Sequence, residues 1–313
     1  MHNTISHKRS VILGAGGFIG INLVNALVTR NHEVVCFDRF PSPHWPQGAI
    51  SITGEFSDLP PELLDALNDA TAYHLVSSCR PSQHTGMAAN EVIADVATTL
   101  RYLESTRDRD VRWVFVSSGG TVYGPDVSCP TREDAPTNPI CSYGLVKLTL
   151  EKYFSLYKKL HGTDFVVARA SNPYGPWQDP SRGQGIIAAL IHKALTGQTV
   201  DIWGDGENIR DYLYIDDAVR GIIELADSGE SGEIYNLSSG KGSTINDLIN
   251  VISRTLGLCV NTNYTYSRTS DVRKSILDSN KLFQLTGWNP KINLDDGIKV
   301  TAEWLSAQGV KTK

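Results

Sequence analysis

Two side chains that could transfer a proton lie close together near the middle of the chain. Tyr143 and Lys147 are four residues apart in the run Ser-Tyr-Gly-Leu-Val-Lys. On a helix this spacing places both side chains on one face. Ser142 precedes the pair and is a suitable N-cap residue for that helix. A phenol beside an ammonium suits acid and base chemistry, so we interpret Tyr143 and Lys147 as the centre of a proton-transfer site.

Hydroxyl groups are predicted to face this pair. Residues 111–116 read Val-Arg-Trp-Val-Phe-Val, a β-branched and aromatic run that is typical of a buried strand. Ser117, Ser118 and Thr121 follow where this strand is expected to end. The glycines among them allow a ligand or another backbone to approach closely. We therefore expect the hydroxyls and the Tyr143 helix to line one site.

A glycine-rich turn near the start of the chain predicts a phosphate-binding loop. A short β-rich run at residues 10–13 leads directly into Gly-Ala-Gly-Gly-Phe-Ile-Gly at 14–20, and a helical pattern follows. Glycines at this spacing allow a tight turn, close approach of a pyrophosphate, and close packing of helix on strand. The anion would lie at the helix N-terminus, where unpaired amides favour it. The residues expected to contact the cofactor here are Gly14, Gly17, Phe18, Ile19 and Gly20.

An acidic residue at the end of the next predicted strand indicates which dinucleotide binds. The strand at residues 33–37 is followed by Asp38. A carboxylate at this place accepts hydrogen bonds from an adenosine ribose and repels a 2′-phosphate, which favours NAD over NADP. Arg39 lies beside it and is a second candidate contact to the cofactor. Because an arginine can bind a 2′-phosphate, NADP stays open as the alternative.

The order of strands and helices predicts an α/β fold with a doubly wound parallel sheet. Strand-like and helical runs alternate up to about residue 170, whereas later residues are rich in turns. We predict a dinucleotide-binding domain from residues 9–171 plus about 210–239. A smaller mixed α/β substrate-binding lobe would then comprise about 172–209 plus 240–313.

Composition limits the class of protein. The net charge of −5 argues against a protein that binds nucleic acid or a membrane surface. The five cysteines form no CxxC pair, so we expect reduced thiols in the cytoplasm and no metal site. We see neither a signal peptide nor an apolar run long enough to span a bilayer.

In this order the motifs closely resemble the extended short-chain dehydrogenase/reductase family, in particular its nucleotide-sugar 4-epimerases. The resemblance covers nearly the whole chain. It is carried by the glycine loop at 14–20, Asp38, the segment 117–124, Tyr143 with Lys147, Asn-Pro-Tyr-Gly-Pro at 172–176, the Trp-Gly-Asp-Gly and Arg-Asp-Tyr motifs within 203–212, Tyr-Asn-Leu at 235–237 and Arg-x-x-Asp at 268–271. It implies a Rossmann fold, NAD as cofactor, a nucleotide sugar such as a UDP-hexose as substrate, and a homodimer.

The resemblance also implies a mechanism that these residues can support. Lys147 and the positive nicotinamide would lower the pKa of Tyr143 from its usual value near 10. The tyrosinate would then take the proton from a sugar hydroxyl while hydride passes to NAD. Ser118 or Thr121 would hydrogen-bond the same sugar oxygen and hold it in line. The 4-keto sugar would turn over in the pocket and receive the hydride on its other face.

Further residues are expected to contact the substrate because of the resemblance. Arg210 and Arg268 resemble arginines that bind the nucleotide diphosphate, for which the planar guanidinium offers paired donors. Asn172 resembles a residue that contacts the bound sugar nucleotide. Ser275 is at the position that controls room near C2 of the sugar. A bulky aromatic residue there restricts related enzymes to glucose and galactose, whereas a small residue such as serine would admit N-acetylhexosamines.

One position departs from the family's pattern. Many 4-epimerases carry a serine or threonine where this chain has Gly119. The hydroxyl role is therefore expected at Ser118 or Thr121, and the sequence does not choose between them. The two residues after Gly119 are not carboxylates, which disfavours the dehydratase and decarboxylase reactions of the family.

Two alternatives remain beside the 4-epimerase. The first is a one-way, NAD(P)H-dependent reductase of 4-keto-6-deoxy nucleotide sugars. Asp38 argues against a reductase that uses NADPH in preference to NADH, because its carboxylate would repel the 2′-phosphate of NADPH. The second is a non-catalytic NAD-binding regulatory protein built on the same fold. Such proteins typically lose the tyrosine or the lysine, and this chain has both.

Overall fold

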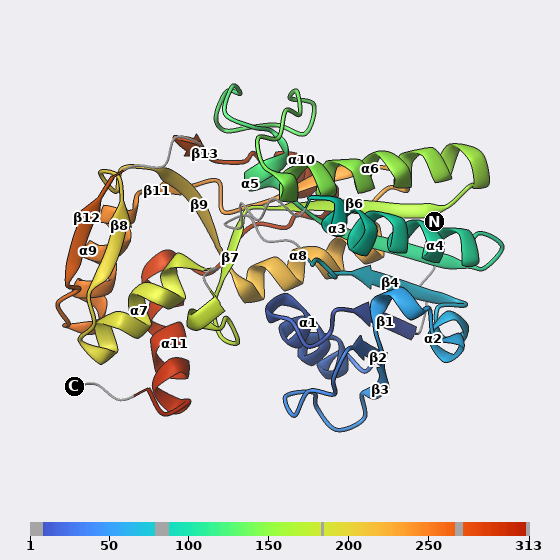
Figure 1. The fold of residues 1–313 in the computed structure, drawn as a ribbon, viewed down its shortest axis with the longest axis horizontal. Coiled ribbons are helices and arrows are strands. Elements are labelled where there is room, and N and C mark those ends of the chain that lie inside the picture. Colours follow the sequence, from blue (N-terminus) through green and yellow to red (C-terminus); the bar gives the residue numbers. More distant parts are fainter. Residues whose placement is uncertain (1–8, 79–87, 183–184, 267–271, 311–313) are drawn as a thin grey trace.

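A seven-stranded parallel sheet is the centre of the molecule (Figure 1). The computed structural model describes residues 9–78, 88–182, 185–266 and 272–310. The strand order is β10-β6-β5-β4-β1-β2-β3, and every neighbouring pair is parallel. The strands are β1 Arg9–Leu13, β2 Glu33–Asp38, β3 Ile50–Thr53, β4 Ala70–His74, β5 Val111–Ser118, β6 Asp164–Ala170 and β10 Ile234–Leu237. This sheet confirms the predicted doubly wound α/β fold.

Helices cover both faces of this sheet (Figure 1). Strand β5 shows why, because Trp113 and Phe115 enter one apolar core while Val114 and Val116 enter the other. A parallel sheet that is buried on both faces has such continuous apolar strands. The covering helices are α1 Phe18–Thr29 and α8 Ile215–Ser228 on one face, and α2 Pro61–Ala66, α4 Thr98–Ser105 and α6 Ser142–His161 on the other.

Short helical segments connect these elements. The chain before α4 is not one regular helix, because it forms α3 Ala88–Glu91 and then a π-helical stretch η2 Val92–Ala97. The remaining short segments are α5 Gly119–Val122 and the 3₁₀ turns η1 Phe56–Asp58 and η3 Pro180–Arg182. The π-helical turns lie next to α6, the helix that carries Tyr143.

Two small sheets form the other part of the molecule. One contains β7 Asn172–Tyr174, β9 Ile209–Tyr214, β11 Gly242–Ser243 and β13 Lys274–Ser275, and the other pairs β8 Val200–Trp203 with β12 Thr262–Thr265. Helices α7 Ile186–Thr196, α9 Ile245–Leu256 and α11 Leu294–Ala307 pack together in this part, whereas α10 Asn280–Thr286 packs on β10 of the large sheet and on α8. One continuous core extends from the α1 and α8 face of the large sheet into this part.

The division into two domains remains a proposal. The large sheet takes its strands from residues 9–170 and 234–237, within the range predicted for the dinucleotide-binding domain. Strand β9 was assigned to the same domain, yet it pairs with β7, β11 and β13 of the smaller part. The boundary near residue 210 therefore falls inside a strand of the smaller sheet.

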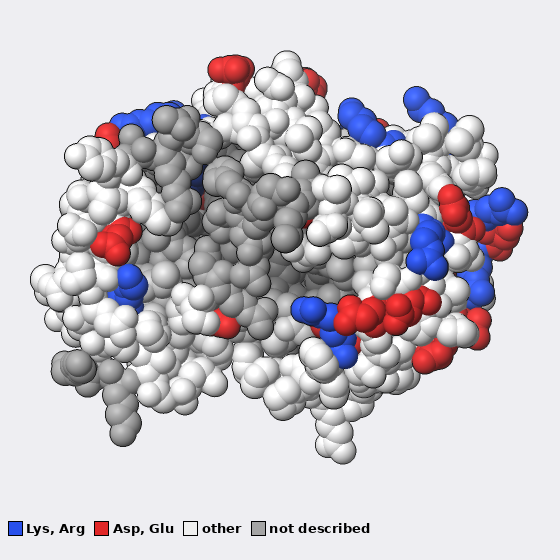
Figure 2. All heavy atoms as spheres, in the orientation of Figure 1, with Lys and Arg blue, Asp and Glu red and all other residues white. Residues whose placement is uncertain are grey.

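The described residues show three further features that bear on possible partners. None of their helices combines the length and apolar character needed to cross a bilayer. They also contain no group of three or more His, Cys, Asp or Glu side chains placed to hold a metal ion. On the face shown in Figure 2, acidic and basic side chains are interspersed, and neither sign forms a continuous patch.

Candidate active site

Helix α6 brings Tyr143 and Lys147 together at the end of β5. The Lys147 Nζ atom lies 5.7 Å from the centre of the Tyr143 ring, which confirms that the two side chains share a face. Nζ donates a hydrogen bond of 3.1 Å to the carbonyl oxygen of Val116, and the Lys147 side chain is buried. The ammonium is therefore fixed beside the phenol at a strand end.

The first turn of α6 is held by contacts on two sides. Cys141 is the N-cap, so Ser142 is the first helical residue rather than the cap, and its Oγ donates to the carboxylate of Glu91. Gly144 packs against the short helix α5 on the other side, because a Cβ atom at this glycine would lie 2.9 Å from the carbonyl oxygen of Thr121. Glycine thus allows the first turn of α6 to approach Thr121 closely.

The three predicted hydroxyls have different surroundings. Ser117 is buried, and its Oγ donates to Oε1 of Glu151 at 2.5 Å, so it points into the protein. Ser118 occupies the N-cap position of α5 without a capping hydrogen bond from its side chain. The Thr121 hydroxyl donates weakly to the carbonyl of Ser118 at 3.5 Å. Ser118 and Thr121 are partly exposed and remain the two candidates beside Tyr143.

Close packing explains why Gly119 carries no hydroxyl. A Cβ atom at this position would lie 2.3 Å from Cδ1 of Leu277 and 3.2 Å from the carbonyl oxygen of Arg169. Leu277 is almost completely buried and fills the space that a serine side chain would need. A serine at position 119 would therefore overlap with Leu277, a residue from the C-terminal part of the chain.

A buried ion pair joins β6 to the helix that carries Tyr143 and Lys147, and it was not identified from the sequence. Nη2 of Arg169 on β6 lies 2.6 Å from Oε2 of Glu151, one helical turn after Lys147. The Arg169 guanidinium also lies 4.7 Å from the centre of the Tyr123 ring. The hydroxyl of Tyr123 donates to Oδ1 of Asn236 at 2.7 Å. The signals that could have revealed the pair were the i+4 spacing from Lys147 and an arginine within an apolar strand.

A second buried group close to the site is His74 on β4. Its Nε2 atom lies 2.8 Å from Oγ1 of Thr99. Burial, together with the positive charge of Lys147, lowers the pKa of His74 from 6.5 to about 3. The imidazole is therefore neutral at physiological pH and adds no second positive charge next to the ammonium.

The glycine loop has the geometry that a dinucleotide phosphate requires. The amides of Gly14 and Ala15 both donate to the carbonyl of Phe37, and Gly14 has a φ of +90°, which favours glycine. A Cβ atom at Gly20 would lie 2.3 Å from the carbonyl oxygen of Gly14, so only glycine fits there. Helix α1 begins at Phe18 without a side-chain cap. Its first amides thus remain available to an anion, as the sequence predicted.

Asp38 lies directly against this loop at the end of β2. Its Oδ2 accepts from the amide of Gly16 at 2.8 Å, and its Oδ1 accepts from the amide of Arg39 at 2.8 Å. A carboxylate so placed fits the ribose end of NAD, and it would repel a phosphate on the 2′-oxygen. The Arg39 side chain is exposed.

The predicted substrate residues meet on the smaller sheet. Arg210 on β9 is in register with Ser275 of β13, and residues in register on neighbouring strands project from the same face. Asn172 on β7 pairs with Tyr212, and its Nδ2 donates to the carbonyl of Asp211 at 2.9 Å. Arg268 lies outside the described residues. The structure therefore brings Arg210 and Ser275 together, with Asn172 on a further strand that pairs with β9.

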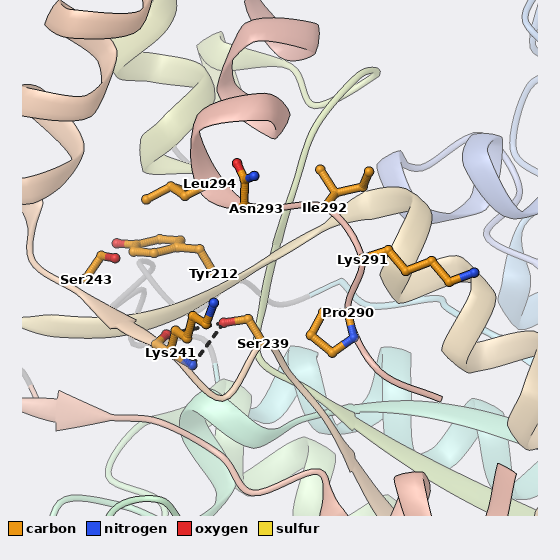
Figure 3. Close-up of a pocket in the computed structure, with 9 residues that line it drawn as sticks. All are labelled: Tyr212, Ser239, Lys241, Ser243, Pro290, Lys291, Ile292, Asn293 and Leu294. Atoms are coloured by element: carbon orange, nitrogen blue, oxygen red, sulfur yellow. Dashed lines mark hydrogen bonds between the residues drawn. The ribbon is translucent and has the colours of Figure 1, made fainter. Parts of the chain in front are cut away.

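Strand β9 is anchored by Asp211, which sequence reasoning did not single out. Its buried carboxylate accepts from the amide and hydroxyl of Ser239 and from the amide of Gly240. Burial raises the pKa of Asp211. A cavity of about 160 Å³ lies next to Ser239, and Figure 3 shows the side chains that line it. It is lined by Tyr212, Ser239, Lys241, Ser243 and residues 290–294, and no predicted site residue is among them.

Known proteins are similar to this chain over nearly its full length. A model of the NAD-dependent epimerase/dehydratase family matches residues 10–238. The UDP-glucose 4-epimerase of Mycolicibacterium smegmatis is 30% identical, over 95% of this chain and 98% of that protein. A dTDP-4-dehydro-6-deoxyglucose reductase of Escherichia coli is 29% identical, over 92% and 94%. The crystal structure of the Thermotoga maritima UDP-glucose 4-epimerase with UDP-glucose has a TM-score of 0.90 and 30% identity, covering 96% of this chain and 99% of that one.

Proposed function

The chain belongs to the NAD-dependent epimerase/dehydratase family, and from this membership we propose that it is a nucleotide-sugar 4-epimerase acting on UDP-hexoses. The observation that carries the proposal is the position of the Lys147 ammonium, buried on the Val116 carbonyl and beside the Tyr143 ring. The similarity to UDP-glucose 4-epimerases over nearly the whole chain supports it as well.

The cofactor is NAD, and the residues of the glycine loop fit it. The amides at the start of α1, after Gly14 and Gly17, would bind the diphosphate, and Asp38 would bind the adenosine ribose. Phe18, Ile19 and Arg39 complete the predicted set of contacts. When bound, NAD supplies the acceptor and later the donor of a hydride.

Tyr143 and Lys147 move the proton in this proposal. The Lys147 ammonium stabilises the phenolate of Tyr143 because opposite charges close together favour the ionised form. The phenolate takes the proton from the sugar 4-hydroxyl when the 4-keto sugar forms, and returns it after the sugar has turned over. The hydroxyl of Ser118 or Thr121 holds the sugar oxygen in line with Tyr143.

The smaller part of the molecule binds the nucleotide sugar. Arg210 would pair with the diphosphate, and Arg268 is proposed as a second arginine for it. Asn172 would contact the bound sugar nucleotide. Ser275 lies in register with Arg210, so a side chain at this position can limit the room beside the substrate. A small serine there supports a proposal that the enzyme also accepts N-acetylhexosamine forms.

The experiment that tests this function uses purified protein. We expect NAD to co-purify, and UDP-galactose to be converted to UDP-glucose without added cofactor. Replacement of Tyr143 by Phe should abolish conversion, because the phenyl ring has no proton to exchange. Tyr153→Phe is the matched control, since it makes the same change on the same helix farther from the site. An active Tyr143→Phe enzyme would rule out the mechanism.

The same assay separates the alternatives. A reductase would consume added NADH or NADPH stoichiometrically with a 4-keto-6-deoxy sugar nucleotide and would not interconvert UDP-hexoses. A regulatory protein would bind NAD and convert none of the UDP-, dTDP- and GDP-sugars. Comparing Ser118→Ala with Thr121→Val then identifies the catalytic hydroxyl as the one whose loss lowers kcat more.

Assembly and location belong to the same proposal. We expect a homodimer in the cytoplasm, with no nucleic-acid or membrane partner. Light scattering of the purified protein checks the dimer, and fractionation of the producing cells checks the location. A monomer with full activity would disprove any need for a second subunit.

A further inference from the structure

Three aromatic side chains from distant parts of the sequence form one stack near the glycine loop. His44 follows β2, Trp177 follows β7, and Trp304 lies on α11. We propose that this aromatic clasp, made of His44, Trp177 and Trp304, holds residues 39–49 over the cofactor and thereby slows the release of NAD. The inference rests on the proposed cofactor site, and it concerns residues to which the reaction itself assigns no role.

The rings are in direct contact. The centres of the His44 and Trp177 rings are 4.4 Å apart, with the planes tilted by 42°. The centres of the Trp177 and Trp304 rings are 5.3 Å apart, in an edge-to-face arrangement. Aromatic pairs prefer such tilted and edge-to-face geometries. Trp177 is thus the central member, with one neighbour from the cofactor side and one from the C-terminal helix.

The segments that carry His44 and Trp177 are tied to the glycine loop and to helix α1, respectively. The indole Nε1 of Trp45, the residue after His44, donates to the carbonyl of Ala15 at 3.0 Å. Nδ2 of Asn22 on α1 donates to the carbonyl of Pro176 at 3.1 Å, just before Trp177. The clasp therefore closes a ring of contacts around the phosphate-binding end of α1.

The backbone at Trp177 is in a conformation that favours glycine. Its φ is +72°, in the left-handed region that bulky side chains rarely adopt. The following residue closes the turn, because the amide of Gln178 donates to the carbonyl of Gly175 at 3.3 Å. In this conformation the Trp177 ring contacts His44 on one side and Trp304 on the other.

The clasp borders a cavity that reaches the glycine loop. The cavity has a volume of about 490 Å³ and is lined by Gly16 and Phe18 as well as by all three members of the clasp. Ser42, from the same segment as His44, also lines it. Space next to the phosphate-binding loop is therefore bounded by residues that come from both parts of the molecule.

Cofactor release requires such a boundary to open locally. Loops that cover a ligand open on their own timescale, and the exchange rate follows the fraction of molecules that are open. Loss of the His44–Trp177 contact should raise that fraction. From the usual strength of an aromatic pair, we expect NAD to dissociate about two- to tenfold faster. Retention matters here because an epimerase must keep its reduced cofactor until the keto sugar has been reduced.

The test measures NAD exchange rather than turnover. The protein is loaded with the fluorescent analogue 1,N⁶-etheno-NAD, excess NAD is added, and the decay of bound fluorescence gives the dissociation rate. The variants are His44→Ala and Trp177→Ala. Phe40→Ala is the matched control, because Phe40 is an aromatic residue of the same segment but is 75% exposed and outside the clasp.

Each outcome decides the proposal. Faster release in His44→Ala and Trp177→Ala, with a wild-type rate in Phe40→Ala, supports the clasp. Should Trp177→Ala fail to fold, as judged by its near-UV circular dichroism, His44→Ala alone decides, since His44 is an exposed loop residue. Wild-type release rates in the clasp variants would overturn the role of the clasp. A release rate in Phe40→Ala as fast as in the clasp variants would overturn it as well. Neither result would affect the proposed cofactor site. A wild-type protein that binds no NAD would refute the cofactor site and the clasp together.

Discussion

Nη2 of Arg169 and Oε2 of Glu151 are 2.6 Å apart, and neither side chain is more than 3% exposed. Loss of one partner leaves a buried charge without compensation. We expect Glu151→Ala to lower the free energy of unfolding by about 3–5 kcal/mol, measured by urea denaturation. The double replacement Glu151→Leu with Arg169→Met should recover most of this loss. The exposed pair Arg9–Glu33 is the control, and Glu33→Ala should cost at most about 1 kcal/mol.

The packing of Leu277 on Gly119 predicts a coupled pair of substitutions. Gly119→Ala places a methyl group where Leu277 already lies, and overpacking of this kind costs about 1–3 kcal/mol of unfolding free energy. The same change made in a Leu277→Ala background should cost much less, because the space is then open. A double-mutant cycle from denaturation curves measures the difference. Additive costs would show that the two positions do not compete for space.

Burial of neutral His74 predicts loss of stability in acid. Its pKa is lowered from 6.5 to about 3 in the folded chain, so between these pH values only the unfolded chain binds the proton. Stability should therefore decline as the pH falls below 6.5, by up to about 1.4 kcal/mol per pH unit. His74→Gln removes this contribution, so its unfolding free energy should change less between pH 7 and pH 5 than that of the wild type. Parallel curves for the two proteins would contradict the prediction.

A bulky residue at Ser275 should change which sugars are accepted. Ser275→Tyr is expected to lower kcat/KM for UDP-N-acetylglucosamine at least about tenfold. A tenfold change corresponds to about 1.4 kcal/mol, and a steric clash between the tyrosine ring and the acetamido group should cost more than that. Turnover of UDP-glucose should be nearly unchanged. Ser275→Ala controls for loss of the hydroxyl and should keep both activities. Equal rates for the acetylated sugar in wild type and Ser275→Tyr would count heavily against this role.

The local patterns in the sequence predicted the main elements well. The run at 111–116 lies in strand β5, and the alternation of strands and helices forms the parallel sheet. The spacing of Tyr143 and Lys147 predicted their shared face, which is confirmed. These features depend on periodicity and on turn-forming residues, which a sequence displays directly. The functional roles of the site residues stay predictions for the experiments above.

Features that depend on contacts between distant segments could not be predicted. Nothing near Gly119 in the sequence indicates that Leu277 fills its side-chain space. The stack of His44 on Trp177 joins segments that share no local pattern. The π-helical turn at 92–97 differs from a regular helix only by a shift of hydrogen-bond partners, which apolar spacing does not reveal. Tertiary packing decides each of these cases.

The short segment after residue 272 has a consequence for engineering this enzyme. It carries Ser275 in register with Arg210 and, two residues later, Leu277 against Gly119. Its backbone also forms two hydrogen bonds with the backbone of Thr131. The Thr131 amide donates to the carbonyl of Ile276, and the Thr131 carbonyl accepts from the amide of Asp278. A chimera that imports this segment to obtain a new sugar preference would therefore also import a new neighbour for Gly119 and helix α5. Libraries aimed at specificity should vary positions 119, 275 and 277 together.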